Sequence, residues 1–187
     1  MNEYYRINVA GLERDLRLFP VNENLKIAAF IMLGDVELTV HCAKALLDIA
    51  PDYDILVTAE AKSIPLISEM AKQAGDKDYI VFRKSPKVYM ENLLEVNVNS
   101  ITTNNIQRLC IGDSEVSKMK GKKCLIVDDV ISTGDSLLAM EKLVNAAGGT
   151  ICGKIAVLAE GDAIDREDIK CLAPLPLFDK DGNPLDK

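Results

Sequence analysis

The chain has 187 residues, a formal net charge of −7 and five cysteines with no Cys-x-x-Cys spacing. The length suits one domain with at most a small appendage, and the negative charge disfavours general nucleic-acid binding. The odd number of cysteines argues against a disulfide framework or a zinc site and fits a reducing compartment. No apolar run approaches the roughly 20 residues of a membrane span, and no secretory signal is apparent. We therefore expect a cytoplasmic protein that binds neither nucleic acid nor membrane.

The two ends of the chain predict a small flap or hood beside a larger core. Residues 1–33 alternate in places around a turn near Gly11, which predicts a hairpin, and they end in an apolar element. Residues 173–187 are punctuated by proline and become polar, so we expect them to join the hood. Residues 34–172 alternate strand and helix signals, which predicts an α/β core with an open, mainly parallel sheet flanked by helices.

The first half of this core predicts two helices and two strands. In chain order these are a helix between Gly34 and Pro51, a strand at 54–58, a helix at 64–74 and a strand at 79–82. A strand, a helix and a second strand in this order predict a right-handed parallel crossover. His41 lies on the first helix, and we expect it to have no catalytic role.

The pattern weakens from Arg83 to Asn105, a segment with no predicted helix. In a compact domain, an irregular segment of about twenty residues is more often functional or mobile than structural. An edge strand at 107–111 and a polar turn at Gly112-Asp113 follow. Beyond them we predict a strand from Lys123, a helix that ends at Gly148-Gly149, and strands at 151–158 and 169–172.

The stretch from Lys122 to Ser136, KKCLIVDDVISTGDS, carries the clearest chemical signal. Its apolar run predicts a buried strand that ends in two carboxylates, Asp128 and Asp129. Small, hydroxylated and flexible residues follow, and then an apolar helical pattern begins. In an open α/β sheet, ligands bind at the carboxyl ends of the strands, so we expect a binding site here.

This order of parts predicts a sugar-phosphate site. A tight turn at Gly134 exposes backbone N–H groups, and these can surround a phosphate together with the hydroxyls of Ser132, Thr133 and Ser136. The following helix adds the positive end of its dipole. The two carboxylates would repel a phosphate and instead suit sugar hydroxyls or a cation. A simple strand end followed by a capped turn is the alternative interpretation.

Residues Val127 to Ser136 resemble the phosphoribosyl pyrophosphate (PRPP) signature of the type I phosphoribosyltransferases. The resemblance implies that family's fold, an open parallel sheet flanked by helices with a small hood. It also implies that the acidic pair, Asp128 and Asp129, binds the ribose. The residues implied to bind the ribose and its 5-phosphate are Asp128, Asp129, Val130, Ile131, Ser132, Thr133, Gly134, Asp135 and Ser136.

Two further loops resemble parts of the same family. Glu60-Ala61-Lys62-Ser63-Ile64 is similar to the Glu-x-Arg-Gly-Phe of adenine-type members, but it has Lys for Arg and Ser for Gly. Arg83-Lys84-Ser85-Pro86-Lys87 resembles the Arg-Lys-x-Gly-Lys that opens their long flexible loop. Tyr89 and Glu91 follow in this loop as candidates for substrate contact or proton transfer. The residues implied to bind pyrophosphate are Glu60, Ala61, Lys62, Ser63, Arg83, Lys84 and Lys87.

The implied reaction transfers ribose 5-phosphate from PRPP to a purine base, releasing a nucleoside monophosphate and pyrophosphate. The catalytic candidates are Asp128, Asp129 and Glu91, with Asp129 the nearer candidate for the N7 proton of the base. Magnesium is the implied cofactor, held by the two aspartates through water and substrate. The resemblance also suggests a homodimer.

Adenine is the favoured base. Orotate-type members carry Lys-x-His-Gly in their lid, which Lys87-Val88-Tyr89-Met90 lacks, and hypoxanthine-guanine types usually begin the signature with Glu-Asp. Xanthine, another purine or orotate remain alternatives. So does a non-catalytic PRPP-binding regulatory protein, because the pyrophosphate loop is altered. A P-loop nucleotidase is disfavoured because no Gly-x-x-x-x-Gly-Lys-[Ser/Thr] occurs.

Overall fold

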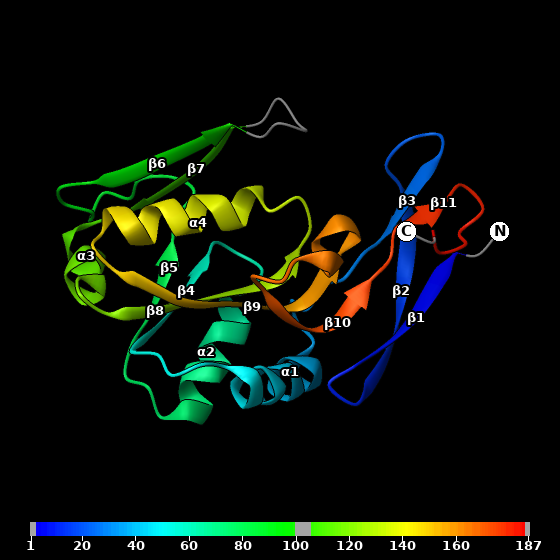
Figure 1. Ribbon diagram of the computed structural model, residues 1–187, viewed down its shortest axis with the longest axis horizontal. Helices are drawn as coiled ribbons and strands as arrows, with labels where there is room; N and C mark the ends of the chain where they lie inside the picture. The colour runs from blue at the N-terminus through cyan, green and yellow to red at the C-terminus, as the bar shows by residue number, and fades with distance from the viewer. Residues whose placement is uncertain (1–2, 100–105, 186–187) are drawn as a thin grey trace.

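The computed structural model describes residues 3–99 and 106–185, and its core is a five-stranded parallel sheet (Figure 1). Its strands lie side by side in the order β10 (Lys170–Leu175), β9 (Thr150–Glu160), β8 (Lys123–Ile131), β4 (Ile55–Ala59) and β5 (Tyr79–Phe82). All four neighbouring pairs are parallel. The central position of β8 agrees with its apolar sequence. A strand that is covered on both faces has no solvent-facing side, so its residues need not alternate between apolar and polar.

Helices cover both faces of this sheet. The helices α1 (Val36–Ile49) and α2 (Ile64–Ala74) pack against one face, and α4 (Asp135–Ala146) packs against the other (Figure 1). The side chains of β8 alternate accordingly. Leu125 and Val127 belong to the apolar cluster with α1 and α2, whereas Cys124 and Ile126 belong to the cluster with α4.

A second, four-stranded antiparallel sheet forms the hood. Its order is β1 (Tyr4–Val9), β2 (Leu12–Pro20), β3 (Leu25–Ala28) and β11 (Phe178–Asp179), so both ends of the chain contribute. The rings of Tyr5 and Phe178 join the two ends edge to face, with centroids 5.0 Å apart. The expected domain boundaries at residues 33 and 172 stay a prediction.

The structure differs from the sequence prediction in several places. The polar turn predicted at Gly112-Asp113 is wrong, because a short helix, α3 (Asp113–Met119), begins there. Seven residues are too few for a clear helical period, although Glu115 accepts a hydrogen bond from the N–H of Gly112 (3.1 Å) as in a capping box.

The segment after Arg83 is also more regular than predicted. The strand β6 (Leu94–Asn99) pairs antiparallel with β7 (Ile106–Ile111), and this ribbon packs on α4. The apolar residues of β6 alternate with Glu95, Asn97 and Asn99 over a length too short to stand out in the sequence. Residues 100–105 of the predicted irregular segment lie outside the described residues.

The sequence analysis also missed the 3-10 helix η1 (Gly161–Asp165). In the described part of the chain, no helix has the length and apolar character needed to cross a membrane.

Candidate active site

The acidic pair lies within β8 and not at its end, contrary to the sequence prediction. The ladder to β9 continues beyond the carboxylates, with Val130 opposite Leu158 and Ile131 opposite Ala159. The pairing holds both aspartates on rigid backbone near the carboxyl end of the strand. Asp129 is 1% exposed, whereas Asp128 is partly exposed.

Burial and the neighbouring carboxylate act on the protonation of Asp128. Desolvation, followed by the neighbouring charge of Asp129, raises the pKa of Asp128 to about 7. Hydrogen bonds from the Ser63 hydroxyl and from the backbone N–H of Asp129 oppose this rise. The pair therefore resists carrying two negative charges, and a cation or a hydroxyl donor placed beside it would be favoured.

The loop after β4 meets the acidic pair directly. Nζ of Lys62 lies 2.7 Å from Oδ2 of Asp129. Oγ of Ser63 lies 2.7 Å from Oδ1 of Asp128, although the two residues are 65 positions apart in the sequence. The loops after β4 and β5 are also tied together, because the N–H of Lys84 donates to Oε2 of Glu60 (2.9 Å). The structure thus brings the two predicted pyrophosphate loops and the acidic pair to one edge of the sheet.

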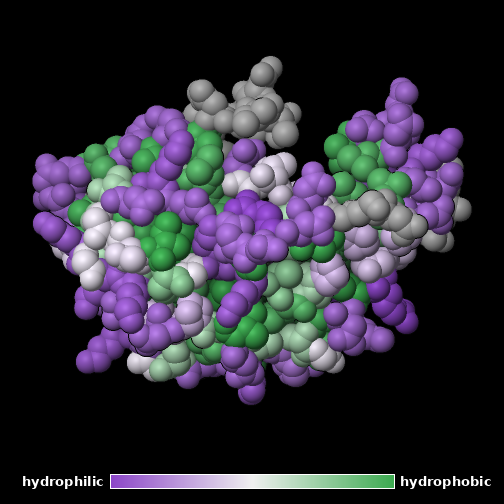
Figure 2. Space-filling view, in the orientation of Figure 1, coloured by the Kyte–Doolittle hydropathy of each residue, from purple (hydrophilic) through white to green (hydrophobic). Residues whose placement is uncertain are grey.

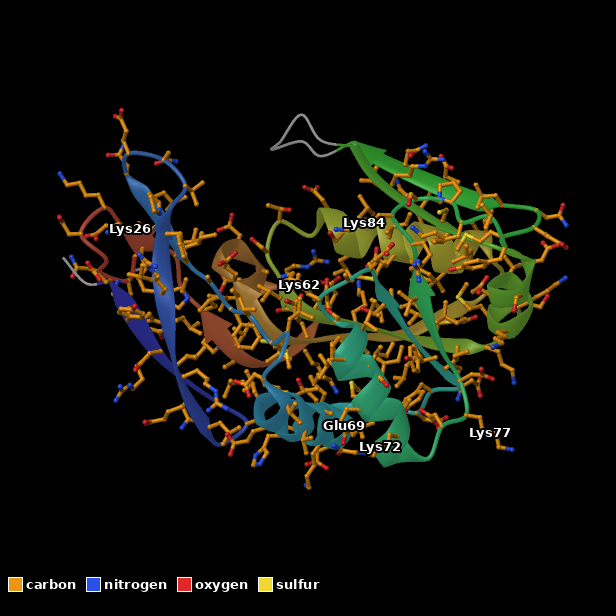
Figure 3. The ribbon with its side chains drawn as sticks, turned by 180° about the vertical axis from the view of Figure 1, so that it is seen from behind. Lys26, Lys62, Glu69, Lys72, Lys77 and Lys84 are labelled. Carbon is orange, nitrogen blue, oxygen red and sulfur yellow. The ribbon has the colours of Figure 1, made fainter. Side chains whose placement is uncertain are left out.

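A cavity of about 130 Å³ lies among these parts. The residues that line it are Ala59, Glu60, Ala61, Lys62, Lys84, Leu109, Asp128, Asp129, Val130 and Ser136. Figure 3 labels Lys62 and Lys84, which come from the loops that follow β4 and β5. Two ammonium groups beside two carboxylates can hold a polyanion at one end and hydroxyl groups or a cation at the other.

A second cavity of about 100 Å³ lies over the turn between β8 and α4. The residues that line it are Asp128, Val130, Ile131, Ser132, Thr133, Gly134, Ser136 and Leu137. Gly134 has a φ of +84°, which favours glycine, and it precedes the first residue of α4. The hydroxyl of Thr133 donates to the Asp135 carboxylate (3.0 Å) within the turn. Size, backbone N–H groups and a helix N-terminus suit this cavity to a phosphate.

Several predicted residues lie outside these two cavities. Lys87, Tyr89 and Glu91 line neither of them, and the Lys87 ammonium donates to the hydroxyl of Ser85 (3.0 Å). Arg83 lines a separate cavity beside α3, although Nη2 of Arg83 lies 3.5 Å from Oε1 of Glu60. Their assigned roles stay predictions.

Two charged residues near the turn escaped the sequence analysis. A Cβ added to Gly134 would lie 2.6 Å from Nη1 of Arg166, so this guanidinium lies against the turn. Nε and Nη2 of Arg166 donate to the Asp168 carboxylate (2.9 and 2.8 Å). Glu160 ends β9, and burial raises its pKa against an opposing hydrogen bond from Ser132. In the sequence, the only signal that these two residues belong to the site is that they follow the last long apolar run.

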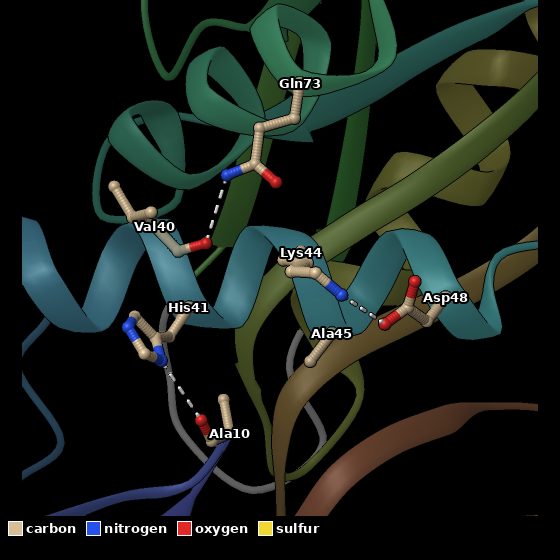
Figure 4. Close-up of a pocket in the computed structure, with 7 residues that line it drawn as sticks. All are labelled: Ala10, Val40, His41, Lys44, Ala45, Asp48 and Gln73. Carbon is tan, nitrogen blue, oxygen red and sulfur yellow. Dashed lines mark hydrogen bonds and ion pairs between the residues drawn. The ribbon is translucent and has the colours of Figure 1, made fainter.

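A larger cavity, of about 410 Å³, lies elsewhere (Figure 4). Residues of α1, α2 and the β1–β2 turn line it, and Nδ1 of His41 lies 3.4 Å from the carbonyl oxygen of Ala10. It shares no lining residue with the other two cavities, and the ammonium of Lys44 in its lining pairs with Asp48 (3.2 Å). By contrast, Figure 2 shows hydrophilic side chains gathered below the notch between the upper part of the hood and the rest of the molecule.

Comparison with known proteins agrees with this geometry. Residues 38–173 match the phosphoribosyl transferase domain, so the chain belongs to the phosphoribosyltransferase family. Among curated relatives, a hypoxanthine/guanine phosphoribosyltransferase of Methanococcus voltae is 30% identical over 145 residues, covering 78% of this chain and 71% of that protein. An orotate phosphoribosyltransferase of Methanopyrus kandleri is 31% identical over 124 residues, or 66% of this chain and 53% of that one.

Solved structures establish the type I fold. An adenine phosphoribosyltransferase of Thermoanaerobacter pseudethanolicus superposes with a TM-score of 0.69 at 22% identity, covering 85% of this chain and 95% of that one. The Saccharomyces cerevisiae adenine phosphoribosyltransferase gives a TM-score of 0.65 at 19% identity, covering 84% and 92%. The fold predicted from the PRPP signature is therefore confirmed.

Proposed function

We propose that the protein is a purine phosphoribosyltransferase, which moves ribose 5-phosphate from PRPP to a ring nitrogen of the base and releases pyrophosphate. One observation carries the proposal. The phosphate-sized cavity over the turn and the cavity beside Lys62 and Lys84 share Asp128, Val130 and Ser136 as lining residues. A substrate with a phosphate at one end, a pyrophosphate at the other and a diol between them matches this order of groups.

Each part of the site has a distinct task in this reaction. The turn from Ile131 to Ser136 binds the 5-phosphate, and Asp128 and Asp129 accept hydrogen bonds from the ribose hydroxyls. Lys62 and Lys84, with Arg83 and Lys87 nearby, counter the charge of the leaving pyrophosphate. Binding at these remote groups positions the anomeric carbon, where an oxocarbenium-like charge develops as the bond to pyrophosphate breaks.

Lys62 must change partners in the course of binding. Its ammonium contacts Asp129 at 2.7 Å, and its side chain is 55% exposed, so it can rotate toward an incoming pyrophosphate. The released Asp129 carboxylate then accepts a ribose hydroxyl or the N7 proton of the base. Glu91 is the second candidate for proton transfer, from the segment that follows β5.

Magnesium fits this donor set only with help from the substrate. In the described ranges, 3–99 and 106–185, no group of three or more His, Cys, Asp or Glu side chains could hold a metal ion. Magnesium, however, commonly uses one or two carboxylates together with water and substrate phosphate oxygens. Asp128 and Asp129 would supply the carboxylates through water and substrate. The bound ion would act as a Lewis acid toward the pyrophosphate leaving group.

Adenine is our first proposal for the base, from the Asp-Asp signature and the two pyrophosphate loops. Hypoxanthine or guanine is the second candidate, because several curated relatives at about 30% identity carry that name. The protein is also proposed to act in the cytoplasm as a homodimer, in keeping with the family resemblance.

The test is to incubate the protein with PRPP and magnesium plus one base at a time, and to detect the nucleoside monophosphate by mass spectrometry. The bases are adenine, hypoxanthine, guanine, xanthine and orotate. AMP supports the first proposal, and IMP or GMP supports the second. Tight PRPP binding without any product would favour the non-catalytic regulatory alternative. A double variant, Asp128→Asn with Asp129→Asn, is the control, and retained activity in it would contradict the ribose role.

A further inference from the structure

We propose that Ser63 is a positioning residue, whose hydroxyl orients the Asp128 carboxylate so that it accepts the ribose hydroxyls. This inference rests on the proposed function. Sequence resemblance assigned Ser63 to pyrophosphate binding and marked it as a departure from a family glycine. The structure gives the side chain different surroundings, since Ser63 is 1% exposed and lines neither cavity of the site.

The hydroxyl of Ser63 does not serve the helix that it precedes. Serine at the N-cap of a helix normally accepts a hydrogen bond from a backbone N–H of the first turn. Ser63 is the N-cap residue of α2, yet its side chain makes no capping hydrogen bond. Helix stability therefore does not explain why a buried serine occupies this position.

The hydroxyl instead joins the acidic pair across the sheet. It donates to Oδ1 of Asp128 at 2.7 Å and accepts from the N–H of Asp129 at 2.8 Å. Oδ1 of Asp129 lies farther away, at 3.3 Å. A hydroxyl has one proton to give, so the shorter contact identifies Asp128 as the partner that receives it.

These contacts fix one oxygen of Asp128. Oδ1 receives the Ser63 hydroxyl at 2.7 Å and, at 2.9 Å, the N–H of Asp129, which it shares with Oγ of Ser63. Two donors on one oxygen restrain the rotation of the carboxylate group. Asp128 also lines both cavities of the site. A carboxylate held in this way is preorganised for a diol that lies between the two phosphate-binding regions.

The test compares a ligand that has the diol with one that lacks it. Isothermal titration measures the dissociation constants of ribose 5-phosphate and inorganic phosphate for the wild type, Ser63→Ala and Ser63→Cys. Both variants are expected to bind ribose 5-phosphate about tenfold more weakly, in line with the loss of a hydrogen bond to a charged group. Their affinity for inorganic phosphate should stay within about twofold of wild type, because the turn at Gly134 is untouched.

Thr58→Val is the matched control, since it removes a buried hydroxyl from the neighbouring strand β4. It should leave both dissociation constants unchanged. Cysteine keeps one heavy atom beyond Cβ, as serine has, and its thiol donates only weakly, so Ser63→Cys decides the question if the alanine variant does not fold.

The outcomes separate this inference from the proposed function. The positioning role would be overturned if the wild type binds ribose 5-phosphate and the Ser63 variants bind it with unchanged affinity. It would also be overturned if the variants lose affinity for ribose 5-phosphate and inorganic phosphate equally. A wild-type protein that binds no ribose 5-phosphate would overturn the proposed function and this inference with it.

Discussion

The Lys62 ammonium lies 2.7 Å from Oδ2 of Asp129, so a mobile cation covers a carboxylate that is 1% exposed. The lysine is the more exposed partner, with 55% of its side chain accessible. A buried carboxylate without a counter-charge is costly, and the ion pair therefore ties the loop after β4 to the acidic pair of β8 in the free protein.

Lys62→Ala should weaken pyrophosphate binding by about tenfold or more, because it removes a cation from the cavity that also contains Lys84. Ribose 5-phosphate should lose less affinity, since the proposed site for its phosphate is the turn between β8 and α4. Titration calorimetry with the two ligands measures both effects. Lys72→Ala is the control, because Lys72 pairs with Glu69 on α2 and lines neither cavity of the site. If Lys62→Ala weakens the binding of both ligands equally, Lys62 does not act on pyrophosphate in particular.

Gly134→Ala should disrupt the turn between β8 and α4, the proposed phosphate site. Its φ of +84° disfavours a side chain, and the new Cβ would lie 2.6 Å from Nη1 of Arg166. We expect a loss of about 1–2 kcal/mol in the free energy of unfolding from the backbone alone. Displacement of Arg166 should add to this loss and weaken binding of inorganic phosphate.

Gly75→Ala separates the cost of the backbone conformation from the cost of the contact with Arg166. Gly75 has a φ of +79°, but its added Cβ would meet nothing within 4 Å. Urea denaturation should therefore give a smaller loss of stability for Gly75→Ala than for Gly134→Ala. Equal losses would show that contact with Arg166 has no energetic consequence.

The unit of β8 and α4 could be predicted because its signals are local. An apolar run, two carboxylates, a flexible turn and a helical period follow one another within about twenty residues. The contact between Ser63 and Asp128 could not be predicted, because it joins two residues 65 positions apart and depends on how β4 and β8 are aligned. The extension of β8 beyond Asp129 was also missed, since polar residues normally mark the end of a buried strand and here they continue it.

Thr58→Val should leave the free energy of unfolding unchanged or raise it by about 1 kcal/mol. Thr58 is fully buried in β4, and its hydroxyl has no hydrogen-bond partner within the described residues. Valine has the same shape and loses no hydrogen bond there. Thermal and urea denaturation measure the change, and a clear destabilisation would indicate a partner for this hydroxyl.

Asp128→Asn should change the pH dependence of stability. The pKa of Asp128 is raised to about 7 in the folded protein, whereas an unfolded aspartate titrates near 3.9. The folded state therefore binds more protons than the unfolded state between these values, so this group lowers stability as the pH rises from about 4 to 7. Asparagine stays neutral, and the variant should gain stability relative to wild type between pH 5 and pH 8.

Asp15→Asn is the control for this measurement. The exposed ion pair with Arg6 lowers the pKa of Asp15, so its carboxylate is ionised in both states above pH 5. The difference between Asp15→Asn and wild type should therefore stay constant from pH 5 to pH 8. Urea denaturation at both pH values gives the comparison. If the difference in stability between Asp128→Asn and wild type is also constant, Asp128 is ionised throughout this range. Burial and the charge of Asp129 then do not raise the pKa of Asp128 into this range.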